Sequence, residues 1–426
     1  MKTTTKTLCG MVAMLAFTAC SSNTDDAVNA PQLWHVTLTA SMNDETTRAL
    51  SEGEGNAIIA SFAENDEVVV VDADGSTIVG TLKAQTAGAS TTLTGDLDAK
   101  TLIADEVVTL RYRSATANYD GQVGTLAGIA ANQDYAEGTL TVSTVDPLTF
   151  TSSHASLAAK QSITKFSFTD GTNAVNVKTF GIAATGLVQS IAADATSTET
   201  IGAVTGTLST PSSAVYVALR NNTGKQAYSF TVKDEAGNWY NGTKNANLTN
   251  GKNYTATVTL TKLADLTSSS GVGTIGVVGG LPAIVISGKK AVALMNVGAL
   301  CPEAYGTYYT YDNRETGLSG KWYVPTKDEL DALATITNTW GTQHGVNGRT
   351  FTIGDKTLFL PAAGYDDNKY NNGLSSVTSY GYYWSSTNYN ETLAYTLNFD
   401  DDEFQINSEY KVDALPVRPF YDLSAE

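Results

Sequence analysis

The side chains best suited to acid–base or nucleophilic chemistry are few and lie far apart in the sequence. The chain has three histidines, His35, His154 and His344, in segments that we expect to belong to different domains. A zinc site or a Ser-His-Asp triad needs such groups gathered in space, and no two histidines have i, i+4 spacing. Cys301 stands alone beside Pro302 and is expected to be a buried free thiol rather than a nucleophile. We therefore predict that the protein is not an enzyme.

One enzymatic alternative stays open. Asp and Glu are abundant, 43 together, so a pair of carboxylates suited to glycoside hydrolysis remains a remote alternative. Such a catalytic site would be recognised by a deep cleft with two carboxyl groups about 5–9.5 Å apart.

Aromatic residues near the end of the chain point to ligand recognition. Residues 281–426 hold 14 of the 21 tyrosines. Sugar rings present apolar faces that stack on aromatic rings. The candidate ligand-binding residues are five tyrosines in or beside expected loops, Tyr365, Tyr370, Tyr380, Tyr382 and Tyr389. Trp322 and Trp384 are expected in the core instead.

Neither a metal nor a cofactor is predicted. Acidic runs at 366–367 and 400–403 could offer oxygen ligands to Ca²⁺, but the sequence has no twelve-residue Ca²⁺ loop. Gly271, Gly273 and Gly276 have the spacing of a dinucleotide-binding loop. No strand pattern precedes them, however, and Pro282 follows where a helix should begin.

Length and charge limit the class of protein. The 426 residues suggest two or three domains, and the formal net charge is −17 with only 16 % charged residues. An acidic chain without basic clusters repels phosphate, which makes nucleic acid an unsuitable partner. The scarcity of charge favours strands and turns over long solvated helices.

The N-terminus carries the features of a targeting segment. Lys2 and Lys6 precede a largely apolar stretch at 8–17, which is shorter than the ~20 residues of a membrane span. The small residues before Cys20 resemble a bacterial lipobox, and the acidic patch at 23–26 resembles surface-export signals of Bacteroidetes lipoproteins. We predict a signal peptide at 1–19, a linker at 20–32 lipidated on Cys20, and an outer-membrane or cell-surface location. An ordinary signal peptide that ends near a cysteine is the alternative.

Short strand patterns fill the middle of the chain. Residues 33–40 alternate and place Trp34, Val36, Leu38 and Ala40 on one face. Further strands are expected at 67–71, 162–168, 214–219, 228–232 and 254–260. This spacing is typical of β-sandwiches, and we predict one at 33–147 and a second at 148–266. A Gly/Ser-rich linker is expected at 267–280.

Residues 281–426 have a different composition and are predicted to form an α+β domain. Thr326 and Glu329 form a capping box that marks a helix start. Leu330, Leu333 and Ile336 then follow on one helix face. The rest of the segment reads as short strands and long polar loops.

The first two predicted domains resemble the Bacteroidetes fimbrillin family. The similar segments are 36–40 running into 46–49, 62–68, 162–168 and 248–260. Members of this family are lipidated precursors built from two β-sandwich, transthyretin-like domains. The resemblance therefore implies a pilus subunit with other fimbrial subunits as partners.

The last predicted domain resembles the Fibrobacter succinogenes major paralogous domain. The similar segments are 322–326, 359–365, 381–387 and 415–419. The resemblance implies a C-type-lectin-like fold without a sugar specificity. The Glu-Pro-Asn and Trp-Asn-Asp tripeptides of calcium-dependent lectins are absent from the sequence. The predicted fold class is thus mainly β with a smaller α+β part.

The fimbrillin resemblance also implies a mechanism of assembly. Family precursors lose their first strand when a trypsin-like protease cuts after an arginine, and a segment of the next subunit then fills the groove. Arg48 is the first basic residue after Lys6, so cleavage between Arg48 and Ala49 is expected. A chain that carries a further domain after the sandwiches is expected at a fibre tip, where it would adhere to a surface glycan or protein. A stand-alone surface lipoprotein that binds glycan or protein is the alternative.

Overall fold

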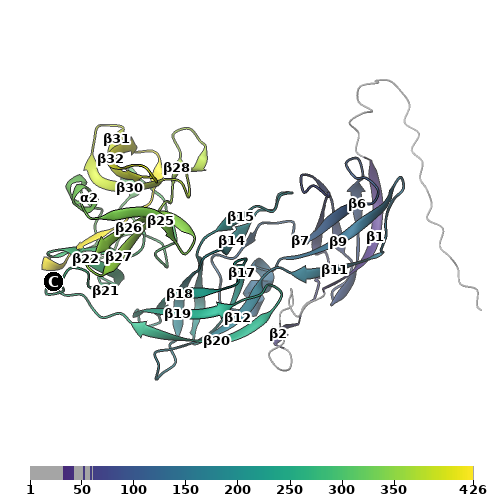
Figure 1. Cartoon of the computed structure of the whole chain (residues 1–426), viewed down its shortest axis with the longest axis horizontal. Helices are drawn as coiled ribbons and strands as arrows, with labels where there is room; N and C mark the ends of the chain where they lie inside the picture. Colours follow the sequence, from purple (N-terminus) through teal and green to yellow (C-terminus); the bar gives the residue numbers. More distant parts are fainter. Residues whose placement is uncertain (1–31, 43–50, 53–57, 60, 426) are drawn as a thin grey trace, which may run out of the picture.

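Strands build three successive bodies along the chain in the computed structural model (Figure 1). The structure describes residues 32–42, 51–52, 58–59 and 61–425. In these ranges the α-helices are α1 (Leu126–Asn132) and α2 (Lys327–Ala334), and neither is long and apolar enough to cross a membrane. The predicted fold class, mainly β with a smaller α+β part, is confirmed. Cys20, Arg48 and Ala49 lie outside the described residues.

The first sheet is built from strands whose apolar residues alternate. Its order is β10-β9-β11-β1-β6-β5-β4-β7, and β9 also pairs with β7, so that the sheet closes around one core. The strands are β1 (Leu33–Met42), β4 (Glu67–Val71), β5 (Ile78–Ala84), β6 (Ser90–Asp98), β7 (Val107–Tyr112), β9 (Ala136–Val145), β10 (Leu148–Phe150) and β11 (His154–Ala159). A separate pair is formed by β2 (Ser51–Glu52) and β3 (Ile58–Ile59).

The second sheet is open and follows the order β15-β14-β17-β12-β20-β19-β18-β13-β16, with β8 beside β14. Its core contains a cluster of three rings, Phe166, Phe168 and Phe230, whose centroids lie 5.1 to 6.2 Å apart. The strands are β8 (Ala117–Asn118), β12 (Ser162–Thr169), β13 (Val177–Ala183), β14 (Leu187–Ile191), β15 (Glu199–Ile201), β16 (Val204–Ser212), β17 (Ala214–Asn221), β18 (Lys225–Asp234), β19 (Trp239–Asn247) and β20 (Asn253–Lys262).

The chain passes between the two sheets later than the predicted boundary at residue 147. The pairing of β11 with β9 and β1 returns residues 148–159 to the first sheet. His154 therefore lies in the same sheet as His35, although the sequence analysis assigned them to different domains. Conversely, Tyr119 and Ile129 precede the predicted boundary but pack into the core of the second sheet.

We call the bodies built on the first and second sheets the first and second sandwich, and a buried polar network lies at their junction. The Gln161 side chain accepts from the Tyr119 hydroxyl at 3.2 Å and from the Tyr135 amide at 3.1 Å. It also donates to the Asp134 carboxylate at 3.0 Å. A satisfied buried network of this kind fixes one relative placement, because breaking it leaves buried polar groups unpaired.

The C-terminal domain is made of four small sheets and α2. The sheets are β21-β22-β23-β34, β24-β33-β28-β29, β25-β26-β27 and β30-β31-β32. The bounds are β21 (Ile275–Val278), β22 (Leu281–Ser287), β23 (Lys290–Ala293), β24 (Tyr309–Thr310), β25 (Asn338–Gln343), β26 (Val346–Ile353), β27 (Lys356–Pro361), β28 (Tyr365–Asp367), β29 (Gly373–Ser375), β30 (Gly381–Asn388), β31 (Leu393–Phe399), β32 (Phe404–Tyr410), β33 (Ala414–Leu415) and β34 (Phe420–Asp422). Single 3₁₀ turns lie at Tyr311–Asn313 and Leu423–Ala425.

Local sequence signals place the main features of this domain. The capping box at Thr326 and Glu329 is present at the start of α2, and Leu330 and Leu333 are buried. Trp322 and Trp384 are also buried in the core. The segment expected as a linker, 267–280, contains strand β21, which pairs with β22.

The C-terminal domain docks directly on the second sandwich. The Trp239 indole donates to the Gly280 carbonyl at 2.9 Å. Gly181 allows close packing, because a Cβ there would lie 2.6 Å from the Cys301 Cβ and 2.8 Å from the Leu300 carbonyl oxygen. Any larger residue at this position must push the two bodies apart.

Candidate functional site

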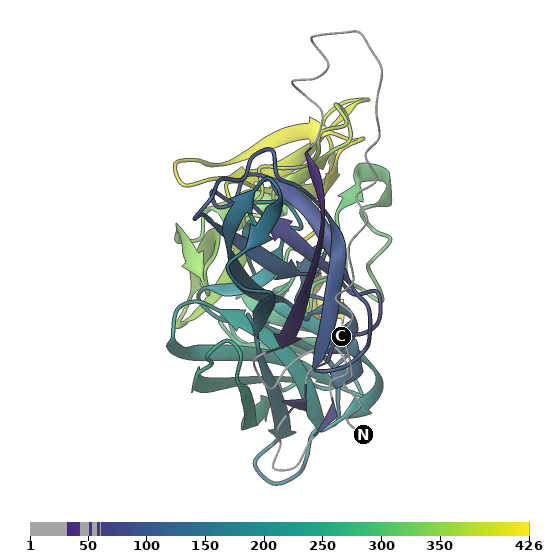
Figure 2. The ribbon, with the colours of Figure 1, turned by 90° about the vertical axis from the view of Figure 1, so that its right-hand side faces the viewer.

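Strand β1 occupies a slot on the outer side of the first sandwich, away from the second sandwich (Figures 1 and 2). It runs antiparallel to β6 from Leu33↔Asp98 to Ser41↔Ser90. It runs parallel to β11 only from Thr39↔His154 to Met42↔Leu157. In the described chain, residues 33–38 are thus paired along one edge alone.

The inward face of β1 completes the core of the first sandwich. Val36, Leu38 and Ala40 are 6 %, 3 % and 0 % exposed. Burial of a Val or Leu side chain contributes about 1.5–3 kcal/mol each, so the strand is held by several kcal/mol of apolar packing. Its absence would leave the apolar floor between β6 and β11 open to solvent.

The outward face of β1 is held by exposed polar pairs. The His35 Nδ1 lies 2.8 Å from the Asp96 Oδ1, and both side chains are mostly exposed. The His154 ring lies 3.0 Å from the hydroxyls of Thr39 and of Ser41. Exposed contacts of this type contribute about 0–1 kcal/mol, so they fix register more than stability.

Three of the five candidate tyrosines form one row in the C-terminal domain. The Tyr365 and Tyr382 ring centroids lie 5.0 Å apart, and those of Tyr380 and Tyr382 lie 6.0 Å apart. The other two stand elsewhere: Tyr370 packs on Tyr410 and Tyr389 packs on Tyr395. The structure therefore does not gather all five candidates into one site.

A pocket of about 180 Å³ opens beside this row on the face of the sheet β30-β31-β32. The strand register brings its central residues together, since Tyr382 lies opposite Asn398 and Asn398 lies opposite Gln405. We call this the tyrosine–amide pocket. Its lining residues are Tyr380, Tyr382, Asn398, Phe399, Asp400, Glu403, Gln405, Asn407 and Glu409.

Two buried polar atoms on this face have no hydrogen-bond partner among the described residues. Asn398 is 8 % exposed and donates from Nδ2 to the Glu409 carboxylate at 3.0 Å, but its Oδ1 accepts no hydrogen bond. Thr396 is fully buried on the same face, and its hydroxyl has no partner either. Desolvation raises the pKa of the Glu409 carboxyl above its usual value, and burial raises the pKa of Tyr382 to about 12.

The acidic runs considered as Ca²⁺ ligands have local roles. Asp367 is buried and accepts from the Tyr370 amide at 3.0 Å and from Asn372 Nδ2 at 2.7 Å. Asp400 accepts from the amides of Asp402 and Glu403 and so shapes a turn. In the described ranges, no group of three or more His, Cys, Asp or Glu residues is placed to hold a metal ion.

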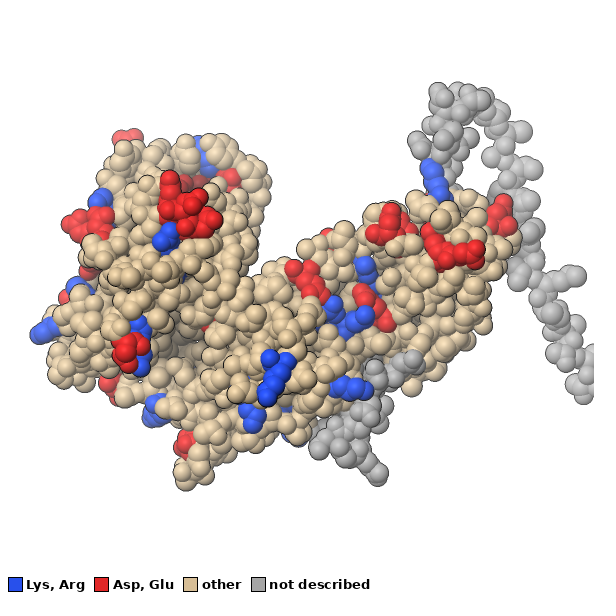
Figure 3. Space-filling view, viewed as in Figure 1, with Lys and Arg blue, Asp and Glu red and all other residues tan. Residues whose placement is uncertain are grey.

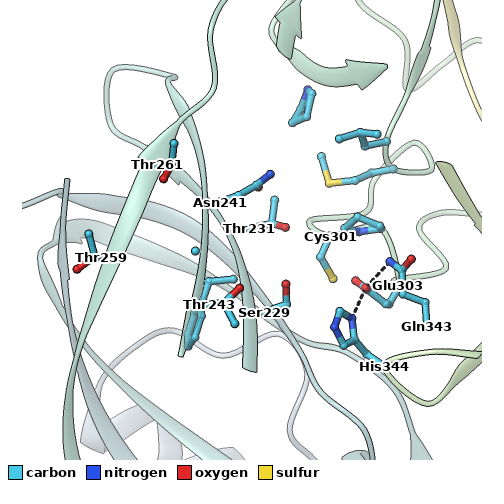
Figure 4. Close-up of a pocket in the computed structure, with 16 residues that line it drawn as sticks. Ser229, Thr231, Asn241, Thr243, Thr259, Thr261, Cys301, Glu303, Gln343 and His344 are labelled. Carbon is cyan, nitrogen blue, oxygen red and sulfur yellow. Dashed lines mark hydrogen bonds and ion pairs between the residues drawn. The ribbon is translucent and has the colours of Figure 1, made fainter. Parts of the chain in front are cut away.

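A second pocket, of about 410 Å³, lies between the second sandwich and the C-terminal domain (Figure 4). One wall consists of hydroxyl and amide side chains from β18, β19 and β20. The other wall carries Glu303, whose carboxylate lies 2.6 Å from the His344 Nδ1 and accepts from Gln343 Nε2 at 2.7 Å. Hydrogen bonding to Glu303 raises the pKa of His344.

Cys301 also lines this pocket, but its environment is that of an inert thiol. The side chain is buried and free, and desolvation raises the pKa of the thiol well above its usual value. A reactive cysteine needs a lowered pKa and an electropositive setting. His344 reaches the pocket because a two-residue turn, His344–Gly345, joins β25 to β26 with both φ values positive.

Neither pocket is predicted as a unit by the sequence. For the tyrosine–amide pocket a signal was available, because Thr396 and Asn398 alternate with apolar residues in an otherwise core-like strand. That pattern puts two polar groups on one buried face. For the interdomain pocket, Glu303 and His344 are 41 residues apart and no local pattern connects them.

Comparison with known proteins relates the chain to both a domain family and several solved structures. Residues 349–420 match a family described as a domain of unknown function, DUF8237. None of the curated proteins matches the chain. The matched segment includes every residue of the tyrosine–amide pocket.

The solved structures similar to the chain include proteins described as adhesive or fimbrial. A putative cell adhesion protein from Bacteroides ovatus is 15 % identical, with a TM-score of 0.33, over 53 % of this chain and 94 % of that one. A fimbrial assembly protein from Parabacteroides distasonis is 11 % identical, with a TM-score of 0.28, over 53 % of this chain and 90 % of that one. A fimbrial protein from Bacteroides ovatus is 9 % identical, with a TM-score of 0.25, over 92 % of this chain and 100 % of that one.

Proposed function

We propose that this protein is a cell-surface fimbrial subunit that joins its neighbour by strand exchange at the β1 slot. The main support for this proposal is the geometry of β1. The strand completes the core with Val36, Leu38 and Ala40, yet β11 pairs with it over only four residue pairs. Removal of this one strand opens an apolar groove that another alternating strand can fill by main-chain pairing. In this proposal the signal is cleavage between Arg48 and Ala49.

The position proposed for the subunit is the tip of the fibre. The last strand of the second sandwich, β20, is paired on both sides, with β12 and with β19. It leads directly into a folded domain that docks on the same sandwich through Trp239 and Gly181. A strand held in this way is a poor donor, whereas the β1 slot is a suitable acceptor.

The C-terminal domain is proposed to be the adhesive part, and lipidation at Cys20 is proposed to anchor the precursor in the outer membrane. No catalytic role is proposed, because the Cys301 thiol is buried and its pKa is raised. His35 and His154 instead bond to neighbouring strands of the first sheet.

The test is the N-terminal sequence and mass of the protein recovered from purified surface fibres. We expect a start at Ala49 and a bound partner subunit. Arg48→Ala should keep the precursor uncut, while Arg48→Lys distinguishes an arginine-specific protease from a general trypsin-like one. A lipid-bearing start at Cys20 with neither fibre nor partner would overturn strand exchange and leave a tethered surface lipoprotein that binds glycan or protein.

A further inference from the structure

We propose that the tyrosine–amide pocket binds a cationic group, the ammonium or guanidinium of a basic side chain on a partner protein. This inference names the ligand class of the domain proposed to be adhesive. It rests on that proposed function for its biological use, but binding to the pocket can be measured without any fibre.

The unpartnered acceptor of Asn398 indicates that the pocket is built for a ligand. Its side chain is more than nine-tenths buried and projects from the pocket face of β31, between Tyr382 and Gln405 in the strand register. A buried acceptor without a donor costs about 1–3 kcal/mol. The Oδ1 of Asn398 is closed to solvent, so a donor-rich ligand relieves that cost through a shift of the side chain. The Asn398 amide also holds the Glu409 carboxylate on the same face.

The charge of the pocket selects the sign of the ligand. Asp400, Glu403 and Glu409 line it, and in the described chain none of these carboxylates forms an ion pair with Lys, Arg or His. Arg349 is attracted by Asp400, but its guanidinium donates to the backbone carbonyls of Asp400 and Glu403 rather than to their carboxylates. The space-filling view likewise shows acidic side chains gathered in patches on this domain (Figure 3).

The tyrosines of the pocket carry no cation over their rings in the described chain. Elsewhere in the domain Lys369 lies 4.8 Å from the centroid of the Tyr410 ring, Lys411 5.3 Å from that of Tyr311, and Lys327 5.6 Å from that of Tyr395. No described basic side chain covers Tyr380 or Tyr382, whose rings are tilted by 31° with centroids 6.0 Å apart. An ammonium group over these rings gains cation–π attraction in addition to the carboxylates.

A neutral saccharide is the competing ligand and is less well matched. Its ring could stack on Tyr382, and its hydroxyls could donate to Asn398. It would, however, leave the carboxylates of Asp400, Glu403 and Glu409 without a counter-charge while covering them. A basic side chain satisfies the orphan acceptor and the charge together.

The experiment is a titration of the full chain with N-acetyl-lysine methylamide, N-acetyl-arginine methylamide and tetramethylammonium, followed by calorimetry or NMR. The uncharged probes are N-acetyl-norleucine methylamide and a methyl galactoside. We expect the charged probes to bind and the uncharged ones not to bind. Binding should weaken several-fold at high salt, because screening shortens electrostatic reach.

Two variants and one control locate the binding. Glu409→Gln keeps the shape and the Asn398 contact and should weaken binding of the charged probes about tenfold, the loss of one charge-assisted hydrogen bond. Tyr380→Ala changes an exposed ring and should weaken it about 2–5-fold. Tyr389→Ala alters an exposed tyrosine outside the pocket and should change nothing.

Equal binding of the norleucine probe, preferential binding of the galactoside, or charged-probe binding that Glu409→Gln leaves intact would each overturn the inference. So would an absence of any binding by the charged probes to a chain shown to be folded by its circular dichroism. These results leave the strand-exchange proposal untouched, since that proposal is judged by the N-terminus of the fibre protein.

Discussion

β1 of the first sandwich and β12 of the second have neighbours in the same arrangement, one antiparallel and one parallel, but the two strands are held in different ways. β1 lies antiparallel to β6 and parallel to β11, and β12 lies antiparallel to β17 and parallel to β20. The parallel pairing covers four residues of β1 but seven of β12. β1 fully buries only the aliphatic Val36, Leu38 and Ala40, with Trp34 partly buried beside them, whereas β12 inserts Phe166 and Phe168 into a ring cluster.

This difference is the one expected between a strand that can be replaced and one that cannot. Val36, Leu38 and Ala40 could be matched by many alternating strands of similar size. The rings of β12 must fit Phe230, and Gln161 just before β12 belongs to the buried polar network. The comparison therefore favours exchange at the first sandwich and permanence at the second.

The largest expected effect tests the permanence of β12. Phe166→Ala should lower the free energy of unfolding of the second sandwich by about 3–5 kcal/mol, because a large cavity opens among the rings. Hydrogen exchange of peptides that cover 162–169, measured across a urea series, would report it. A loss below about 1 kcal/mol would mean that the ring cluster does not anchor β12.

The next effect tests the slot of β1. Leu38→Ala should cost about 2–5 kcal/mol, toward the lower end, because a strand with one open edge can relax into the cavity. Exchange should rise in 33–42 and 90–98 while the second sandwich is unchanged. Thr37→Ala, on the exposed face, is the matched control. Equal destabilisation of both sandwiches would contradict their separate roles.

A third prediction concerns the Glu303–His344 pair within the C-terminal domain, on the wall of the pocket that faces the second sandwich. Glu303→Gln should cost about 1.5–3 kcal/mol, the contribution of a hydrogen bond to a charged group. The pKa of His344 is raised in the folded state, so the pair contributes its full stabilisation below the unfolded-state pKa of 6.5. That stabilisation is lost as the pH rises through the folded-state pKa. The melting-temperature difference between the parent chain and Glu303→Gln should thus shrink from about pH 5 to about pH 9. A difference that grows with pH would contradict this assignment.

The smallest expected effect concerns the exposed, outward face of β1. His35→Ala removes a contact between side chains that are 67 % and 62 % exposed and should cost at most about 1 kcal/mol. Chemical denaturation of the first sandwich is the measurement. A cost like that of Leu38→Ala would show that the outward face, rather than apolar packing, retains the strand.

Local patterns in the sequence predicted much of this fold. Alternation predicted β1, and the capping box at Thr326 predicted the start of α2. The return of 148–159 to the first sheet was missed, because the pairing of Thr39 with His154 joins residues that are 115 apart and leaves no local signal.

The candidate sites were less predictable than the strands. The row of rings formed by Tyr365, Tyr380 and Tyr382 exists because β28 and β30 are adjacent. Tyr370 and Tyr389 project from separate turns. Composition alone cannot distinguish these cases. The partners Asn398 and Glu409 come from β31 and β32, and only the strand register shows that they share a face.

The register of β1 has a mechanical consequence. Its ladder with β6 runs through nine consecutive pairs, from Leu33↔Asp98 to Ser41↔Ser90. Tension directed along the strand strains all of these pairs at once in shear, whereas a pull across the strand opens them one after another like a zipper. A joint made in this slot would withstand drag along a fibre and still yield to peeling from the end at Leu33, where one edge is open.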